Sequence, residues 1–306
     1  MNFIITGGAG FIGINIALEL EKQGHHVYLV DNLSSGSKDN LKEFQGTFIQ
    51  EDIRTIDWEK RFGNLDIACV FHEAAITDTR VMDERLIKAV NVDAFKRLAE
   101  YCISKNIKLV YASSAAVYGS ATPPMKEDQK LTPLNPYGKS KMKMDEVALE
   151  LMEKSPKSII IGLRYFNVFG PYEAKKGSFA SMIYQLYTLM KKGKNPRVFS
   201  YGEQTRDHVY VKDVVKINLL AYKSKKSGIY NTGTGIETSF NEIIENWNKL
   251  LDLNLKTEFM ENPYGFFQKR TCADLGKIRV EFGYKPEFNV EKGMEDYLMF
   301  LKKENL

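Results

Sequence analysis

Short apolar runs alternate with amphipathic stretches through the first half of the chain. The apolar runs predict buried strands at residues 2–6, 26–30, 47–50, 67–72, 108–113 and 158–164. Apolar residues at helical spacing predict helices at residues 11–23, 84–105 and 136–153. Because strands and helices alternate, we expect an α/β fold with a doubly wound parallel sheet.

The alternation ends near residue 166. Beyond that point the pattern predicts helices at residues 177–192 and 290–303, and short strands at 197–199 and 228–232. We therefore expect a first domain at residues 1–166 and a smaller α+β substrate lobe at residues 167–306. Segments near residues 207–235 are expected to return to the first domain.

Composition and charge narrow the class of partner. The 306 residues are 43% hydrophobic, as in an ordinary globular protein, and the net charge is only +4. We therefore expect no nucleic-acid partner, and no apolar run is long enough to cross a membrane. Cys69, Cys102 and Cys272 lack metal-ligand spacing, so we expect no metal site and reduced thiols in the cytoplasm.

A glycine-rich turn, TGGAGFIG at residues 6–13, joins the first predicted strand to the first helix. Gly7 allows the tight turn, Gly10 lets the backbone approach a pyrophosphate, and Gly13 lets the helix pack on the strand. The first N–H groups of the helix then face the phosphates. The turn therefore predicts a Rossmann domain that binds a dinucleotide.

Acidic residues follow the second and third predicted strands. Asp31 can accept hydrogen bonds from the adenosine ribose, which favours NAD, whereas Lys38 could reach the 2′-phosphate of NADP. Asp52 and Ile53 would border the adenine, unless Asp52 is simply a solvated acid at the end of a strand. The choice between NAD and NADP stays open.

Tyr137 and Lys141 are four residues apart and share one face of a predicted helix. A free tyrosine has a pKa near 10, but a nearby ammonium and a positive nicotinamide ring favour its phenolate. Lys141 can also hold the nicotinamide ribose. Ser114, in the segment YASSAAVYG, can hydrogen-bond the substrate oxygen whose proton Tyr137 takes. These three residues are the predicted catalytic set.

Three further polar residues have both a functional and a structural interpretation. His72, Ala74 and Ala75 follow the fourth predicted strand, where the chain passes the cofactor, although a lone histidine there is more often structural. Asn91 lies within a predicted helix and could steady the backbone near the serine strand. Arg206 could bind a diphosphate, or form an ion pair with Asp207.

The second half adds two weaker candidates. Lys176 lies in a loop that could close on a sugar, or it is an ordinary surface lysine. Phe266 and Phe267 could line a base or sugar pocket, or belong to the core.

Together these motifs resemble the extended short-chain dehydrogenase/reductase family of nucleotide-sugar enzymes. The resemblance rests on TGGAGFIG, DNL, YASSAAVYG, PYGKSK, RYFNVFGP and RDHVYVKDV and covers nearly the whole chain. It implies a tightly held NAD or NADP that is recycled, a nucleotide-diphosphate sugar as substrate, and a homo-oligomer.

A narrower resemblance is to the ADP-L-glycero-D-manno-heptose 6-epimerases. It rests on FHEAA, GPYEAKKGSFAS, GEQTRD and NPYGFFQKR. It implies that Lys176 is a second catalytic acid/base facing Tyr137 across the substrate. The residues implied at the cofactor are Phe11, Ile12, Asp31, Asn32, Lys38, Asn91, Lys141 and Val168. The residues expected at the substrate are Asn167, Ser178, Gln185, Phe199, Arg206 and Phe267. Gln185 and Phe267 stand where some members have histidine and tyrosine.

The expected activity is therefore epimerisation of a nucleotide sugar at C6″ by transient oxidation and re-reduction. A UDP-hexose 4-epimerase and a heptose-nucleotide dehydrogenase that releases a keto sugar stay open. A 4,6-dehydratase is disfavoured because Ala115 and Ala116 stand where elimination needs an acid. A redox sensor without catalysis is disfavoured by the intact Ser114, Tyr137 and Lys141.

Overall fold

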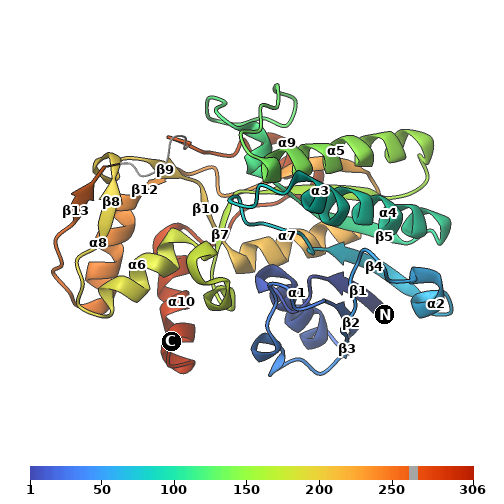
Figure 1. The fold of residues 1–306 in the computed structure, drawn as a ribbon, viewed down its shortest axis with the longest axis horizontal. Coiled ribbons are helices and arrows are strands. Elements are labelled where there is room, and N and C mark those ends of the chain that lie inside the picture. Colours follow the sequence, from blue (N-terminus) through green and yellow to red (C-terminus); the bar gives the residue numbers. More distant parts are fainter. Residues whose placement is uncertain (262–267) are drawn as a thin grey trace.

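A parallel sheet of seven strands forms the larger part of the molecule (Figure 1). The computed structural model describes residues 1–261 and 268–306. The strands, in the order in which they lie across the sheet, are β11 (Gly228–Thr232), β6 (Ile160–Tyr165), β5 (Lys108–Ser114), β4 (Ile67–His72), β1 (Asn2–Thr6), β2 (His26–Val30) and β3 (Thr47–Ile49). Successive strands are added on one side of β1, as β2 and β3, and then on its other side, beginning with β4. A ligand crevice is therefore expected at the carboxyl ends of β1 and β4.

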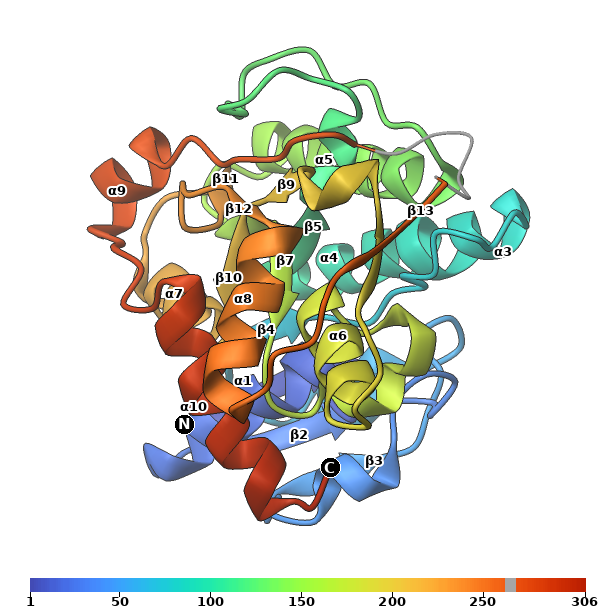
Figure 2. The same ribbon diagram turned by 90° about the vertical axis from the view of Figure 1, so that its left-hand side faces the viewer.

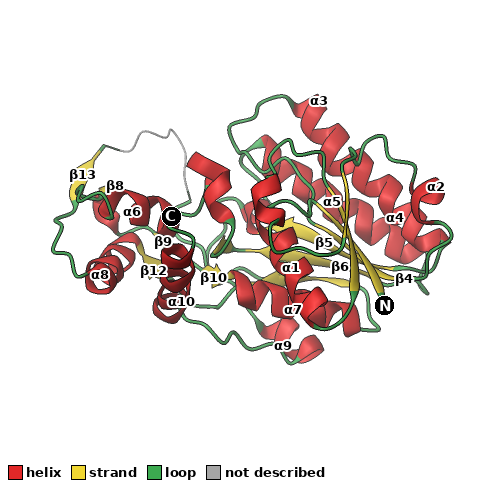
Figure 3. Ribbon diagram, turned by 90° about the horizontal axis from the view of Figure 1, so that it is seen from below, coloured by secondary structure: helices red, strands yellow, loops and turns green. Residues whose placement is uncertain are grey.

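Helices cover both faces of this sheet (Figure 3). Those on the large domain are α1 (Phe11–Lys22), α2 (Trp58–Phe62), α3 (Glu84–Ile87), α4 (Ala94–Ser104), α5 (Pro136–Lys154), α7 (Val211–Lys223) and α9 (Gly276–Phe282). In β1, Phe3 and Ile5 join one apolar cluster while Ile4 joins the other. Alternate side chains are thus buried on opposite faces, as expected for a sheet covered on both sides. The predicted doubly wound parallel sheet is confirmed.

A smaller group of elements packs beside the carboxyl ends of the strands (Figures 1 and 2). Its helices are α6 (Met182–Met190), α8 (Phe240–Leu251) and α10 (Val290–Lys303). Its strands pair as β7 (Asn167–Phe169) with β10 (His208–Tyr210), β8 (Arg197–Phe199) with β13 (Glu258–Met260), and β9 (Thr205–Arg206) with β12 (Thr238–Ser239). Trp247 is fully buried in its core and donates to the carbonyl of Ile183.

β11 comes late in the chain, yet it pairs with β6 at the edge of the large sheet. The helix before it, α7, packs against α1 and β5. The division into residues 1–166 and 167–306 stays a prediction.

The predicted long helix at residues 84–105 is confirmed, but it is not regular throughout. A π-helical turn at Lys88–Asp93 separates α3 from α4. Asn91 in this turn is fully buried and bonds the backbone of Ile76, which accounts for the local departure from regular α-helix.

The predicted helix at residues 177–192 begins later than expected, at Met182. Residues Glu173–Phe179 form 3₁₀ turns instead, and Gly177 has φ +56°, which a regular helix does not allow. The pattern assigned no element to α7 or α8. The α8 start does carry a local signal, because Ser239 and Glu242 form a reciprocal capping box.

No helix in residues 1–261 or 268–306 is long and apolar enough to span a membrane.

Candidate active site

The glycine-rich turn between β1 and α1 forms a cradle with no room for side chains. Gly7 has φ +67°, and a Cβ there would lie 2.7 Å from the backbone nitrogen of Ala74. A Cβ on Gly13 would lie 2.4 Å from the carbonyl oxygen of Gly7. No side chain caps α1 at Gly10, so the N–H groups at Phe11 and beyond are open to an anion. This arrangement fits the pyrophosphate of a dinucleotide.

Asp31 lies at the end of β2 beside the cradle. Its buried carboxylate accepts hydrogen bonds from the backbone of Ala9 at 3.1 Å and of Leu33 at 2.7 Å. Burial raises the pKa of this carboxyl, and the two hydrogen bonds partly oppose the effect. A Cβ on Gly36 would lie 2.8 Å from the carboxylate, so a larger residue there would displace it. The fold thus holds one carboxylate at the edge of the phosphate cradle.

Asp52 follows β3 and is tied to its neighbours. Asn32 donates to it at 3.0 Å and Arg54 at 2.7 Å. The hydrogen bond from Arg54 holds the pKa of Asp52 well below its usual range. Asp52 is therefore hydrogen-bonded to its neighbours at a partly exposed strand end, and its place beside the adenine stays a prediction. Ile53 is buried, and Lys38 begins the short 3₁₀ helix Lys38–Leu41.

The fold brings Tyr137, Lys141 and Ser114 together. Asn135 caps α5 by accepting from the backbone of Gly138, which places Tyr137 in the first turn and Lys141 on the same face. Ser114 ends β5 and is hydrogen-bonded to the Tyr137 side chain. The Lys141 Nζ donates to the carbonyl of Ala112 at 2.7 Å and lies 5.9 Å from the centre of the Tyr137 ring.

Burial controls the protonation of this set. It raises the pKa of Tyr137, and the hydrogen bond to Ser114 opposes that rise. Burial also lowers the pKa of Lys141 to about 8, against the charges of Glu73 and Asp145. Desolvation therefore opposes the phenolate form of Tyr137 that the sequence predicts in the presence of the ammonium and a positive nicotinamide ring. The protein by itself keeps Tyr137 protonated.

His72 has a structural role beside the cradle. Its Nδ1 lies 2.7 Å from the hydroxyl of Thr6, which also accepts from the backbone of Ala74 at 3.3 Å. Burial lowers the pKa of His72 to about 3, so the ring is neutral. Ala74 and Ala75 are half-buried along the same segment. Cofactor contacts from this segment stay a prediction.

Asn91 holds the next part of the same segment. Its side chain accepts from the backbone nitrogen of Ile76 at 2.8 Å and donates to the Ile76 carbonyl at 3.0 Å. It also donates to the hydroxyl of Ser140, which itself donates to the carbonyl of Tyr137. Asn91 therefore links the backbone beside the cradle to the first turn of α5.

Lys176 approaches the cradle from the smaller group of elements. It lies in the 3₁₀ helix Glu173–Phe179, and its Nζ is 5.6 Å from the centre of the Phe11 ring at the start of α1. Burial lowers its pKa, while the charge of Glu173 raises it. Lys176 is thus not an ordinary surface lysine.

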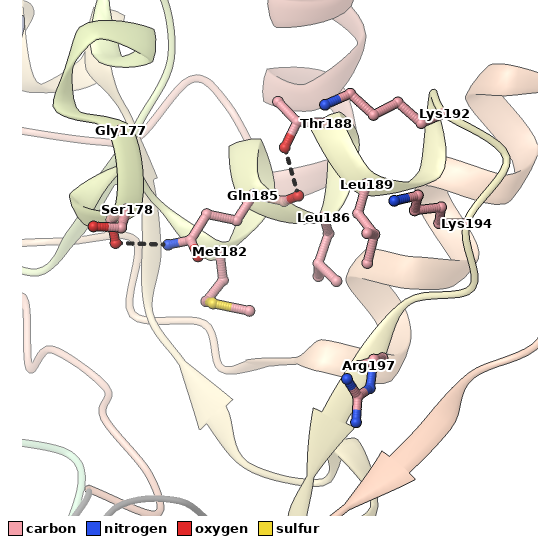
Figure 4. A pocket seen from close by; sticks show the side chains of 10 residues that line it. All are labelled: Gly177, Ser178, Met182, Gln185, Leu186, Thr188, Leu189, Lys192, Lys194 and Arg197. Atoms are coloured by element: carbon pink, nitrogen blue, oxygen red, sulfur yellow. Dashed lines mark hydrogen bonds between the residues drawn. The ribbon is translucent and has the colours of Figure 1, made fainter.

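A pocket of about 460 Å³ opens beside the Lys176 loop (Figure 4). Ser178 and Gln185, both predicted at the substrate, line it. Gln185 donates to the carbonyl of Ala180 at 2.7 Å. The remaining lining residues are Gly177, Met182, Leu186, Thr188, Leu189, Lys192, Lys194 and Arg197. Three of the lining residues, Lys192, Lys194 and Arg197, are cationic.

The other predicted substrate residues are more scattered. Asn167 and Val168 lie in β7, Asn167 with an exposed side chain. Phe199 ends β8 and is half-buried. Phe266 and Phe267 lie outside the described residues.

Arg206 is a partly buried cation that does not pair with its neighbour. Its guanidinium donates to the carbonyl of Thr205 at 2.8 Å, and burial lowers its pKa to about 10. The Asp207 carboxylate instead accepts from Thr234 and from the backbone of Gly235. The alternative of an ion pair with Asp207 is wrong, and among residues 1–261 and 268–306 no carboxylate forms a salt bridge with Arg206.

Two acidic residues near the site were missed by the sequence analysis. Glu73 accepts from the Tyr165 hydroxyl at 3.0 Å, and burial raises its pKa to about 7. Glu173 is fully buried and accepts from Ser181. Glu73 stands beside a predicted site residue in the sequence and Glu173 stands near one, but nothing local indicates that Glu73 is half-buried and Glu173 fully buried. In the described part of the chain, no group of His, Cys, Asp and Glu could hold a metal ion.

The fold and the site define an enzyme that works with a bound dinucleotide. Residues 3–233 match the model of the NAD dependent epimerase/dehydratase family. The chain therefore belongs to that family.

The chain is also similar to individual proteins of known or assigned activity. The chain is 37% identical to an ADP-L-glycero-D-manno-heptose-6-epimerase of Brachyspira hyodysenteriae, over 98% of each chain. The crystal structure of the Helicobacter pylori ADP-L-glycero-D-manno-heptose-6-epimerase matches with a TM-score of 0.91 and 36% identity, over 98% of this chain and 96% of that one. The Thermotoga maritima UDP-glucose 4-epimerase with UDP-glucose matches with a TM-score of 0.92 and 28% identity, over 100% of both chains. The Bacillus cereus UDP-glucuronic acid 4-epimerase, solved with UDP-glucuronic acid and NAD, has a TM-score of 0.88 and 27% identity, over 99% of this chain and 100% of that one.

Proposed function

We propose that the protein interconverts the C6″ epimers of ADP-glycero-D-manno-heptose by transient oxidation and re-reduction. The observation that carries this proposal is that Tyr137 and Lys176 come from separate parts of the fold, Tyr137 from the first turn of α5 and Lys176 from the loop that approaches Phe11 at the cradle. Identity of 37% and 36% to two heptose 6-epimerases over nearly the whole chain supports the same substrate.

The cofactor's place follows from the cradle. Gly7, Gly10 and Gly13 leave room for a pyrophosphate against the start of α1, and Asp31 offers a carboxylate to the ribose. A nicotinamide held there would supply the redox chemistry, by taking up a hydride from the sugar carbon and giving it back. Lys141 lies within reach of Tyr137 and is suited to hold the nicotinamide ribose.

The protein's own residues move the protons. In one direction, Tyr137 or Lys176 removes the proton of the C6″ hydroxyl. After rotation about the C5–C6 bond, the other of these two groups returns a proton to the oxygen at C6″. The two groups exchange roles in the reverse direction. Ser114 holds the reacting oxygen through its hydroxyl and shares a hydrogen bond with Tyr137. Two groups on opposite sides allow a proton to be taken from one face and delivered to the other.

The second candidate is a UDP-hexose 4-epimerase, which the Thermotoga likeness favours. There the whole sugar ring turns and one tyrosine serves both faces. Lys176→Ala separates the two: a severe loss of turnover supports two bases, and little loss supports the 4-epimerase. Lys249→Ala is the control, because Lys249 of α8 pairs with Glu291 of α10 and makes no contact with the Lys176 loop that the structure records.

The decisive experiment is proton NMR of the purified protein with ADP-D-glycero-D-manno-heptose and, separately, UDP-glucose, without added cofactor. Conversion of the heptose to its C6″ epimer supports the proposal and a retained cofactor. Galactose signals from UDP-glucose, with the heptose unchanged, would overturn it. A keto sugar together with net reduction of the cofactor would instead indicate a dehydrogenase.

We propose NAD as the preferred dinucleotide. A 2′-phosphate would lie against the Asp31 carboxylate, whose two backbone hydrogen bonds hold it in place. Titration of the cofactor-free protein with NAD and with NADP tests this preference. Asp31→Asn should reduce the difference between the affinities for NAD and for NADP. Tighter binding of NADP by the unaltered protein, abolished in Lys38→Ala, would reverse the assignment.

A further inference from the structure

The loop that carries Lys176 has an unusual backbone. It connects β7 to α6, and Gly170, Tyr172 and Gly177 have φ of +140°, +73° and +56°. Positive φ is uncommon outside glycine and is disfavoured for a tyrosine. Such a loop does not hold its shape by local preference, so other contacts must fix it.

Glu173 supplies the internal contact. Its side chain is fully buried, and its carboxylate accepts from the backbone nitrogen of Gly170 at 3.0 Å. It also accepts from the backbone nitrogen of Ser181 at 2.6 Å and from the Ser181 hydroxyl at 3.0 Å. One carboxylate therefore joins the two ends of the loop. A buried carboxylate is tolerated only when donors surround it in this way.

Lys176 stands three residues after Glu173. In a 3₁₀ turn, residues i and i+3 lie on the same side, so the carboxylate and the ammonium are neighbours. The other titratable groups near Glu173 are the phenols of Tyr184, Tyr210 and Tyr297, which approach from α6, β10 and α10. These phenols are uncharged at neutral pH. Glu173 is thus the negative charge that acts on Lys176 within the loop, and it opposes the effect of burial on the ammonium.

The outer side of the loop is tied to the large domain. Asn15 of α1 donates to the carbonyl of Pro171 at 3.0 Å, and Tyr172 donates to Glu43 at 3.1 Å. These contacts orient the loop toward the start of α1. Two further contacts do the same, an ion pair between Lys175 and Asp39 and the guanidinium of Arg80 placed 3.9 Å from the centre of the Phe179 ring.

We propose that Glu173 is the positioning residue for Lys176. Its carboxylate joins the two ends of the loop that holds Lys176 beside the start of α1, and it serves as the counter-charge of the Lys176 ammonium. This inference rests on the proposed function, in which Lys176 is an acid/base. Glu173 itself reaches neither substrate nor cofactor in this role.

The test measures Lys176 directly. Competitive acetylation with acetic anhydride at a series of pH values, read by peptide mass spectrometry, gives the pH at which Lys176 becomes reactive. We expect Glu173→Gln to lower that midpoint by about one pH unit, because an opposite charge is lost. We also expect kcat to fall by about 10- to 100-fold, because the loop is displaced. Glu242→Gln is the matched control, since Glu242 also accepts from the backbone and hydroxyl of a serine, Ser239, but at the start of α8.

The outcomes are distinct. An unchanged Lys176 midpoint in Glu173→Gln overturns the inference. A lowered midpoint with unchanged kcat supports the link between Glu173 and Lys176 but contradicts the proposed function, because Lys176 would not be an acid/base. If Glu173→Gln does not fold, Glu173→Asp decides: the charge remains but is one methylene shorter, so the midpoint should be kept while kcat falls. Wild-type kcat in Glu173→Asp would refute the positioning role.

Discussion

Lys141 is a buried cation beside a buried phenol. Only 2% of its surface is exposed, and its ammonium has one hydrogen bond, to the carbonyl of Ala112. Its pKa of about 8 reflects this burial. The site therefore places Lys141 and Tyr137 where loss of water makes their charged forms unfavourable.

Replacing Tyr137 by phenylalanine tests the proton-transfer role. We expect kcat to fall by about 10² to 10⁴, since one positioned acid/base contributes that much. The aromatic ring remains, so cofactor affinity should change little. Turnover can be followed by NMR and cofactor binding by titration. A variant with near-normal turnover would exclude Tyr137 from the chemistry.

The buried Lys141 ammonium should also cost stability. Its folded pKa of about 8 lies below its unfolded value of 10.5, so the cost is fully present below pH 8 and disappears as the pH rises to about 10.5. The unfolding free energy of the wild type, relative to Lys141→Met, should therefore rise by on the order of 3 kcal/mol across that window. Urea denaturation of both proteins at several pH values measures it. A difference independent of pH would contradict the burial argument.

The π-helical turn between α3 and α4 is the element that joins the cradle to the catalytic helix. Its Asn91 makes three hydrogen bonds, to Ile76 and to Ser140. The same turn packs against α5. Local backbone geometry in this element thus affects the position of Tyr137, although Asn91 is far from it in sequence.

Asn91→Ala should lower the unfolding free energy by about 1–3 kcal/mol, because the buried hydroxyl of Ser140 and the half-buried backbone groups of Ile76 lose a partner. It should also lower kcat, because Ser140 and the first turn of α5 lose support. Asn248→Ala is the control: Asn248 bonds the backbone nitrogen and carbonyl of Leu255 in the same way, away from the site. The control should lose stability but keep its kcat. Equal kcat in both variants would show that Asn91 is purely structural.

At the scale of the whole molecule, the smaller group of elements packs beside the carboxyl ends of the large sheet (Figures 1 and 2). β10 pairs with β7 at this junction and carries His208, which is 2% exposed. Burial lowers the pKa of His208 to about 3, so its ring is neutral in the folded protein.

Acid should therefore weaken the fold through His208. The unfolded histidine binds a proton below pH 6.5, whereas the folded one does not until about pH 3, so stability is lost as the pH falls through this range. Between pH 6 and pH 4.5 the wild type should lose about 1.4 kcal/mol per pH unit more than His208→Gln. Denaturant titrations at each pH provide the comparison. Parallel pH profiles would mean that His208 is protonated in the folded state.

The seven strands of the large sheet, the glycine-rich turn and the spacing of Tyr137 and Lys141 could be predicted from the sequence, because each depends on residues close together in the chain. Apolar runs define β1 and β5, and a four-residue spacing on a helix gives one face whatever surrounds it. The family follows from the same local motifs.

The tertiary structure alone decided which polar groups are buried and what they face. Burial raises the pKa of Tyr137. The Asp207 carboxylate accepts hydrogen bonds from Gly235 and its neighbours rather than from Arg206, and Glu173 accepts hydrogen bonds from both ends of the Lys176 loop. Hydrogen bonds and desolvation depend on side chains brought together from distant parts of the chain. For that reason the sequence by itself determined the elements and the chemical groups, and packing determined their protonation and their partners.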